Sequence, residues 1–500
     1  MTIGQVRDAV RSGARSASDI CRATLAQIDS LNPQLNAFNS VVADRALARA
    51  EAIDRDPSRW RDAPLAGVPI AVKDNICTRG VRTTASSRML EHYVPPYDAT
   101  AVSRLESAGA VIVGKTNCDE FAMGSSNETS AFGPAHNPWA LDRTPGGTSG
   151  GSAAAVAARL TPAALGSDTG GSIRQPSSLC GVVGVKPTYG RVSRYGLIAH
   201  GSSLDQIGPI AATARDAAIV LGVLAGADAA DSTSAPEPVS DFSAALTGDV
   251  RAVRIGVPRA LLERGVDPEV AEATSAALDG LKARGAALVD IDLPHARYAT
   301  PVYYLVSTAE ASSNLARYDG VRYGFRAGPK GPRDAGLQRM GDDQTGDNQL
   351  GDMYRRTRAK GFGAEVKRRI MLGTYVLSAG YYEAYYLKAQ QVRTLILRDY
   401  DRAFERVDAV AMPTSPVPAF RIGERIADPL QMYLIDVFTV SANLTGLPAI
   451  SVPCGFTAGR LPIGLQLTGR RFDEATLLRV ADAYERDTTW ATQLPPILSR

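Results

Sequence analysis

Residues 146–152 read Gly-Gly-Thr-Ser-Gly-Gly-Ser, and residues 166–174 read Gly-Ser-Asp-Thr-Gly-Gly-Ser-Ile-Arg. Both stretches place hydroxyl side chains between glycines, which let the backbone approach a ligand closely and turn its N–H groups toward it. Upstream, the apolar residues 65–72 are followed by Lys73. Because a hydroxyl can act as a nucleophile and a neutral lysine can act as its base, the three segments indicate acyl-transfer chemistry that needs no histidine.

Short apolar runs alternate with helical patterns around these two clusters. Residues 65–72 and 110–113 are predicted to form buried strands, and the alanine-rich residues 152–160 are predicted to form a helix that begins at the first cluster. Alternating strands and helices predict an α/β fold. We therefore expect a mixed central β-sheet covered by helices on both faces, with the glycine clusters and Lys73 at its centre.

The rest of the chain extends this pattern, and we expect a single domain over residues 1–500. Residues 1–60 are predicted to be helical, and residues 61–215 are predicted to form the core. Residues 327–352 contain almost no large apolar side chains and are predicted to be a mobile insertion. Further elements are expected as a strand from residue 254, a helix over about 267–285, a tyrosine-rich helix over 375–404, and strands over 409–412 and 449–452.

The composition argues against several classes of protein. The 500 residues are 45% hydrophobic and 21% charged, as in ordinary globular proteins, and the net charge of +3 does not by itself favour nucleic-acid or membrane binding. The five cysteines are scattered without a Cys-x-x-Cys pair, so neither a disulfide framework nor a metal site is expected. The N-terminus has no apolar signal core, and no run of about 18 apolar residues occurs, so we expect a cytoplasmic protein without a membrane span.

Residues 109–116 match the pattern of a phosphate-binding loop, Gly-x-x-x-x-Gly-Lys-Thr. The four spacer residues are Ala-Val-Ile-Val, which favour a buried strand over a flexible loop whose N–H groups surround a phosphate. The spacer residues thus argue against nucleotide binding. A nucleotide-binding protein is kept as a further hypothesis, which a binding measurement on the isolated chain would test.

Residues 147–151 fit Gly-x-Ser-x-Gly, the nucleophile elbow of α/β-hydrolases, with Ser149 as the nucleophile. That arrangement needs an acid and then a histidine downstream, and only His200 and His295 follow. Neither histidine lies in a recognisable signature, and isolated histidines are more often structural. The elbow is thus an alternative to a site based on lysine.

The lysine-based site has candidates for both the base and the oxyanion stabilisation that acyl transfer needs. Lys73 ends a buried apolar run, so desolvation is expected to lower its pKa and leave neutral amine to act as a base. A hydroxyl at the start of the helix over 152–160 would lie at the positive end of the helix dipole. The N–H groups that can form a nest for an oxyanion are those of Thr169, Gly170, Gly171 and Ser172.

The motifs at residues 146–152 and 166–176, together with Gly-Val-Lys-Pro-Thr-Tyr-Gly at residues 184–190, resemble the amidase signature family. Members of that family use a nucleophilic serine, a second serine with a cis peptide bond, and a lysine. The resemblance implies the amidase signature fold and amide hydrolysis without histidine.

The resemblance also implies roles for single residues. Ser172 takes the place of the acyl nucleophile and Lys73 the place of the base. The cis-serine position falls on Thr148, which keeps the hydroxyl but adds a methyl group. Ser149 lies next to it and can support or share the role.

Segments outside these motifs resemble the A subunits of the glutamyl/aspartyl-tRNA amidotransferases. These segments are residues 311–324, 365–374, 378–386 and 428–439. The resemblance implies one subunit of a glutamine-hydrolysing C–N ligase, which hydrolyses glutamine and passes ammonia to its partners. Those partners would be a tRNA-binding, ATP-using B subunit together with a small C subunit, in a heterotrimer that amidates misacylated Glu-tRNA(Gln), Asp-tRNA(Asn) or both. ATP and Mg are expected in the B subunit, whereas no cofactor is expected in this chain. The alternative is a stand-alone amidase that hydrolyses a small carboxamide.

A glutamine pocket similar to that of the family needs an anion for the α-ammonium group and a cation for the α-carboxylate. By the resemblance, Asp436 fits the first role, and Arg369 fits the second through a bidentate contact. Tyr303 is a third candidate. Arg368 is the alternative to Arg369, and Tyr304 is the alternative to Tyr303.

Overall fold

The computed structural model describes residues 1–263, 265–328 and 349–499. Its centre is an 11-stranded sheet with the order β1-β3-β2-β4-β6-β5-β10-β11-β9-β7-β8. The strands are β1 Phe38–Val41, β2 Pro69–Lys73, β3 Val111–Thr116, β4 Ala163–Asp168, β5 Val183–Lys186, β6 Gln206–Ala211, β7 Arg254–Val257, β8 Ala287–Asp290, β9 Ala409–Pro413, β10 Ala449–Phe456 and β11 Pro462–Gly469. Parallel and antiparallel pairs both occur, so the sheet is mixed, as predicted.

Two parallel central strands decide where the site lies. β2 pairs in parallel with β4, with Ile70 opposite Ala163 and Val72 opposite Leu165. Every residue of both strands is buried, which explains why both are apolar up to their last one or two residues. Because the strands are parallel, their carboxyl ends meet at one edge of the sheet, and Lys73 and Asp168 end them side by side.

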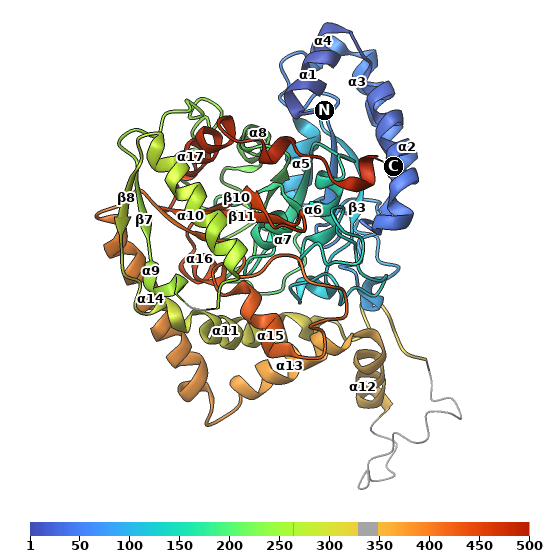
Figure 1. Ribbon diagram of the computed structural model, residues 1–500. Helices are drawn as coiled ribbons and strands as arrows, with labels where there is room; N and C mark the ends of the chain where they lie inside the picture. Colours follow the sequence, from blue (N-terminus) through green and yellow to red (C-terminus); the bar gives the residue numbers. More distant parts are fainter. Residues whose placement is uncertain (264, 329–348, 500) are drawn as a thin grey trace.

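Helices cover both faces of this sheet (Figure 1). Neighbouring residues of a strand point to opposite faces, and accordingly Ile70 and Val72 belong to one hydrophobic core while Ala71 belongs to another. The helices are α1 Ile3–Ser12, α2 Ala17–Leu35, α3 Ala43–Arg55, α4 Pro57–Trp60, α5 Thr100–Ser107, α6 Gly150–Ala157, α7 Arg174–Cys180, α8 Ala214–Leu224, α9 Arg259–Leu262, α10 Pro268–Ala283, α11 Ala299–Asn314, α12 Gln349–Gly361, α13 Ala364–Val376, α14 Lys388–Phe404, α15 Pro429–Tyr433, α16 Val440–Thr445 and α17 Glu474–Arg486. The predicted α/β fold is confirmed.

Helices α6 and α7 follow the two glycine clusters directly. α6 begins at Gly150, and α7 begins at Arg174, two residues after Ser172. A Cβ atom at Gly151 would lie 2.5 Å from the carbonyl oxygens of Ala37 and Asn117, so this position of α6 requires a glycine. The glycines of the clusters therefore have two roles. They form part of the candidate site, and they let the first turn of a helix pack closely against neighbouring backbone.

Two differences from the predicted elements have local causes. The N-terminal region is mostly helical but also contains β1, because α2 ends at Asn36 in the left-handed conformation with φ 45°. The predicted helix over 375–404 is broken: α13 ends at Val376, Gly380 has φ 84°, and a π-helical segment, η7 (Tyr382–Leu387), precedes α14.

The predicted insertion over 327–352 falls mostly on residues 329–348, which lie outside the described residues. Its last residues, from Gln349 onward, form the start of α12 instead of loop. Among the helices of the described residues, none combines the length and the apolarity needed to cross a membrane.

Helices α11 and α13 approach each other closely at Gly373. A Cβ atom at this position would lie 1.9 Å from the carbonyl oxygen of Thr308, closer than any real Cβ contact. α11 carries Tyr303 and α13 carries Arg369, two of the predicted binding residues. The glycine thus sets the distance between the two helices that present them (Figure 1).

Gly373→Ala should therefore destabilise the protein by about 1–3 kcal/mol, because the added methyl group overpacks the α11–α13 contact. Denaturant unfolding of the full chain measures the effect. The matched control is Gly222→Ala in α8, where a Cβ atom meets nothing within 4 Å. The control should stabilise the helix by roughly 0.5–1 kcal/mol, and equal stability of the two variants would contradict the close-contact explanation.

Candidate active site

Lys73 lies at the carboxyl end of β2 and is completely buried. Its Nζ donates to Thr148 Oγ1 at 2.6 Å, to Ser167 Oγ at 3.0 Å and to the carbonyl oxygen of Ser167 at 3.2 Å. Burial lowers the pKa of Lys73 to about 8, because the charged form loses its hydration. A lysine with this pKa holds a usable fraction of neutral amine near neutral pH, as a general base requires.

Thr148 and Ser149 have different surroundings. The peptide bond between Gly147 and Thr148 is cis, and the Thr148 hydroxyl faces Lys73. The Ser149 hydroxyl instead donates to the carbonyl oxygen of Ser167 at 3.1 Å and accepts from the Ser167 N–H at 3.3 Å. The structure therefore places Thr148 against Lys73 and ties Ser149 to the backbone of β4.

Ser172 is the member of the group that can be reached from outside. It is 7% exposed, whereas Lys73 and Thr148 are 0% exposed. Its carbonyl oxygen accepts from the Ser149 N–H at 3.1 Å, which holds the second glycine cluster against the first. In the part of the chain that the structure describes, the Ser172 hydroxyl makes no hydrogen bond, so it is not bonded to the Thr148 hydroxyl.

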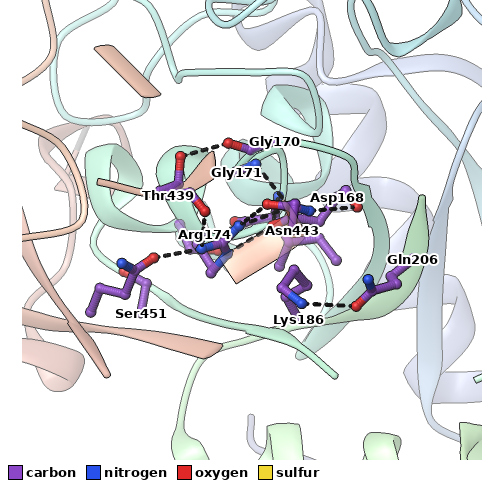
Figure 2. Close-up of polar contacts among 12 residues, drawn as sticks. Asp168, Gly170, Gly171, Arg174, Lys186, Gln206, Thr439, Asn443 and Ser451 are labelled. Atoms are coloured by element: carbon purple, nitrogen blue, oxygen red, sulfur yellow. Dashed lines mark hydrogen bonds and ion pairs between the residues drawn. The ribbon is translucent and has the colours of Figure 1, made fainter. Parts of the chain in front are cut away.

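A buried ion pair holds the loop that carries Ser172 (Figure 2). Arg174 binds Asp168 in a bidentate manner, with Nε to Oδ2 and Nη2 to Oδ1 both at 3.0 Å. Both side chains are 0% exposed. Burial alone would raise the pKa of Asp168, but the charge and hydrogen bonds of Arg174 hold it well below its usual range. Asp168 is therefore a permanent anion at the base of the loop.

Partners from the C-terminal part of the chain complete this ion pair (Figure 2). Arg174 donates to the Thr439 carbonyl oxygen at 3.0 Å, to Gln466 Oε1 at 2.6 Å and to Asn443 Oδ1 at 2.6 Å. Asn443 Nδ2 in turn donates to Asp168 Oδ1 at 2.9 Å. None of these three partners was predicted from the sequence: Asn443 and Gln466 lie in segments without a recognisable motif, and Thr439 ends the segment 428–439 without any sign of a contact with Arg174.

The predicted oxyanion nest is smaller than expected. The N–H of Gly171 donates to Asp168 Oδ1 at 2.8 Å, so it is not free for a ligand. Gly171 has φ 137°, and a Cβ atom there would lie 2.3 Å from Thr439 Oγ1, which explains the glycine. No hydrogen bond from the N–H groups of Thr169, Gly170 and Ser172 occurs within the described residues, so these three remain available as oxyanion donors.

Asp436 lies in a short 3₁₀ helix, η8 (Leu434–Asp436), and is 6% exposed. Ser125 Oγ donates to its Oδ2 at 2.5 Å. Burial raises the pKa of Asp436 to about 7, although the Ser125 hydrogen bond and the charge of Arg369 oppose the shift. A cation bound here would favour the ionised form further. Ser125 was not predicted from the sequence.

Arg369 is 1% exposed and lies beside a stacked pair of aromatic rings, Tyr304 and Tyr433. Its Nε donates to Glu365 Oε1 at 2.8 Å, and its guanidinium lies 5.3 Å from the Tyr304 ring centre and 5.7 Å from that of Tyr433. The side chain of Arg368 is 41% exposed, so it fits a buried binding role less well than Arg369.

Tyr303 lies over the loop that carries Ser172. A Cβ atom at Gly170 would lie 2.7 Å from the Tyr303 hydroxyl oxygen. Burial raises the pKa of Tyr303, so the phenol stays protonated and can donate. Tyr304 instead stacks on Tyr433 with ring centres 3.9 Å apart. Of the two tyrosines, Tyr303 is therefore the one that packs against Gly170, in the loop that carries Ser172.

A cavity of about 280 Å³ adjoins these residues. Its walls include Ser125, Glu365 and Tyr433, which contact Asp436, Arg369 or each other. Arg368 also lines this cavity, whereas Ser172, Tyr303, Arg369 and Asp436 are not among its lining residues. No cluster of three or more possible metal ligands occurs among residues 1–263, 265–328 and 349–499.

The two competing motifs are not supported. Lys115 is completely buried in the sheet, and its Nζ donates to Thr78 Oγ1 at 3.1 Å, to Thr83 Oγ1 at 3.0 Å and to the carbonyl oxygen of Ile76. It has no room for a phosphate, as its apolar spacer residues indicated. His295 pairs with Asp399 at 3.0 Å, and no contact joins Ser149 to a histidine in the described segments.

Comparisons with known proteins show which proteins the chain resembles. The family model described as Amidase matches residues 19–478. The chain is 57% identical over 497 residues to the A subunit of glutamyl-tRNA(Gln) amidotransferase from Roseiflexus sp. (strain RS-1), covering 99% of this chain and 98% of the relative. It is 54% identical over 493 residues to the protein of the same name from Geobacter metallireducens, covering 99% and 98%.

Solved structures of similar proteins share the fold. The crystal structure of the glutamyl-tRNA(Gln) amidotransferase A subunit from Thermotoga maritima matches with a TM-score of 0.78 and 43% identity, covering 98% of this chain and 95% of that one. The native peptide amidase from Stenotrophomonas maltophilia matches with a TM-score of 0.79 and 29% identity, covering 98% and 97%. The fold and the lysine-hydroxyl arrangement thus occur in a chain similar to amide-cleaving proteins.

Asp168→Asn should destabilise the protein by about 3–5 kcal/mol, because it leaves Arg174 as a buried charge without its counter-ion. Denaturant unfolding measures the loss. Asp249→Asn is the control, because it breaks an ion pair with Arg251 whose two side chains are 45% and 80% exposed. The control should leave stability unchanged within error. A loss at position 168 no larger than that of the control would contradict a structural role for the ion pair.

Proposed function

This chain belongs to the amidase family, and on that premise we propose that it is the glutamine-hydrolysing A subunit of a tRNA-dependent amidotransferase. The observation that carries the proposal is the 2.6 Å contact between the buried Nζ of Lys73 and the Thr148 hydroxyl, beside the accessible Ser172. The full-length similarity to amidotransferase A subunits supports glutamine as the substrate.

The proposed reaction begins with attack of Ser172 Oγ on the side-chain carbonyl carbon of glutamine. The hydroxyl proton passes to Thr148 Oγ1, while Thr148 gives its own proton to the neutral amine of Lys73. The oxyanion of the tetrahedral intermediate accepts hydrogen bonds from the N–H groups of the loop that are unpaired within the described residues, those of Thr169, Gly170 and Ser172. Its collapse breaks the C–N bond, and the proton held by Lys73 returns through Thr148 to the leaving nitrogen, so ammonia departs.

The second half of the reaction regenerates the enzyme. Water attacks the glutamyl ester of Ser172 and loses a proton through Thr148 to Lys73. Collapse of this intermediate breaks the ester bond, and Ser172 regains its proton as glutamate leaves. Each proton taken up by the relay in one step is returned in the next, so the cycle is balanced.

Recognition of glutamine is assigned to three side chains. Asp436 binds the α-ammonium group, and the terminal nitrogens of Arg369 bind the α-carboxylate. Tyr303, above Gly170, contacts the substrate close to the reacting carboxamide. The ion pair of Arg369 with Glu365 and its contacts with two rings fix the direction of the guanidinium before the substrate arrives.

The partners proposed for this chain follow from the relatives, whose name describes one component of a tRNA amidotransferase. A tRNA-binding B subunit that uses ATP and Mg would activate the carboxylate of misacylated Glu-tRNA(Gln) or Asp-tRNA(Asn) and accept the ammonia. A small C subunit would complete a heterotrimer. Purification of the full chain from its native host, followed by identification of the proteins that copurify, tests this assembly. The B and C subunits should both be found.

Ser172→Ala should lower glutamine hydrolysis by about 10³-fold or more while leaving the thermal unfolding of the protein unchanged. The measurement is glutamate release by the full chain together with the subunits that copurify with it. A variant that retains more than a tenth of the wild-type rate would overturn Ser172 as the nucleophile. Faster hydrolysis of simple carboxamides than of glutamine by the wild type would favour a stand-alone amidase instead.

Thr148→Val should lower kcat for glutamine by about 10²-fold or more, because it keeps the shape of the side chain and removes the relay oxygen. Thr148→Ser should retain activity, since serine supplies the same hydroxyl. Ser149→Ala is the matched control: it removes a hydrogen bond to Ser167, with a stability loss of about 1 kcal/mol, and should leave most of kcat. An active valine variant beside an inactive Ser149→Ala variant would assign the relay to Ser149.

A further inference from the structure

The side-chain amide of Gln175 connects two parts of the site that are remote in sequence. Gln175 lies in the first turn of α7, three residues after Ser172, and is 0% exposed. Its Nε2 donates to the carbonyl oxygen of Ser125 at 2.9 Å. Its Oε1 accepts from the N–H of Gly147 at 3.0 Å. Both polar ends of the amide are therefore used, and each end holds backbone of a different segment.

The Ser125 end leads to substrate recognition. The hydroxyl of Ser125 donates to Asp436 Oδ2 at 2.5 Å, while its carbonyl oxygen receives the Gln175 amide. Ser125 is 1% exposed, so neither contact exchanges readily with water. An ammonium group bound at Asp436 would share this carboxylate with the Ser125 hydroxyl. Any adjustment of Ser125 then acts directly on its bond to Gln175.

The Gly147 end leads to the proton relay. Gly147 is joined through its cis peptide bond to Thr148, whose hydroxyl contacts Lys73 at 2.6 Å. A Cβ atom at Gly146 would lie 2.4 Å from Gln175 Oε1, so the amide is packed tightly against this backbone. The N–H of Gly147 is the donor that Gln175 fixes, one residue before the relay hydroxyl.

We propose that Gln175 is a positioning residue that links binding of the substrate's α-ammonium group at Asp436 to the alignment of Thr148 for proton transfer. The inference rests on the proposed function. Its consequence is that glutamine is preferred in kcat as well as in KM, because a carboxamide without an α-ammonium group leaves the contact between Asp436 and Ser125 unchanged. Interactions that improve only when the correct substrate is bound raise the rate of the chemical step.

The test compares glutamine with butyramide, a carboxamide that lacks both α-substituents, on the full chain with its copurifying subunits. Gln175→Met keeps the length of the side chain and removes both hydrogen bonds. It should lower kcat for both substrates, but kcat for glutamine more, so that the kcat ratio of glutamine to butyramide falls about tenfold. An equal loss for both substrates would show that Gln175 only supports the backbone and would overturn the link.

A double-mutant cycle supplies the second readout. Ser125→Ala removes the hydrogen bond to Asp436, so it should also lower the kcat ratio of glutamine to butyramide. The double variant Ser125→Ala/Gln175→Met should show a kcat ratio no lower than that of either single variant. Multiplicative losses would mean that the two residues act independently and would also overturn the proposal. Should Gln175→Met not fold, Gln175→Glu, which keeps the acceptor for Gly147, is used in the same cycle.

Two controls separate this inference from the proposed function. Gln390→Met changes a partly buried glutamine of α14, away from the site, and should leave both substrates unaffected. A wild-type protein that does not prefer glutamine to butyramide contradicts the proposed function and the inference together. A wild-type preference for glutamine that survives in Gln175→Met contradicts the inference alone.

Discussion

The buried ion pair between Asp168 and Arg174 is the interaction on which the rest of the site depends. Taking two charges out of water costs several kcal/mol for each ion, and their mutual attraction offsets this only when the remaining donors and acceptors are also satisfied. Here the N–H groups of Gly171 and Ile173 fill the remaining positions on Asp168. The pair therefore fixes the path of the whole loop, and Ser172 lies inside that loop.

A second constraint is the parallel pairing of β2 and β4. It brings the ends of two buried strands to one edge of the sheet, where Lys73 contacts the backbone and the hydroxyl of Ser167. Full burial makes the ammonium form of Lys73 unfavourable, and the neutral hydroxyl and carbonyl groups around it compensate only in part. The same desolvation that weakens the folded state thus supplies the base. The buried surroundings of Lys73 thus affect both the stability of the fold and the basicity of the amine.

Much of the site could be predicted from the sequence because its residues lie within short glycine-rich motifs. The hydroxyl clusters, Lys73 and the α/β alternation of strands and helices are local signals. The apolar spacer residues also indicated a strand over 110–113 within the phosphate-loop pattern, and β3 (Val111–Thr116) lies there. Strands β4, β5, β6, β8 and β11 were not predicted, although β11 carries a period-two alternation of Ile463, Leu465 and Leu467.

The remaining features depend on contacts between distant segments. The choice between Thr148 and Ser149 depends on which hydroxyl meets Lys73, and adjacent residues cannot be distinguished by spacing alone. The loss of Gly171 as an oxyanion donor depends on Asp168 bending back onto the loop. Ser125 and Gln175 meet although 50 positions separate them, and neither stands in a pattern that indicates its partner. Such contacts become visible only when the chain is folded.

The partners of Arg174 also have a consequence for the order of events during synthesis. Thr439, Asn443 and Gln466 come from the last part of the chain, whereas Asp168, Ser172 and Lys73 come from its first half. A chain emerges from the ribosome with its N-terminal part first, at about 5–20 residues per second. By that rate, Arg174 and its counter-ion Asp168 are made tens of seconds before the uncharged groups that complete the hydrogen bonding of the arginine exist. The nascent first half carries every reacting group and is still not an active site.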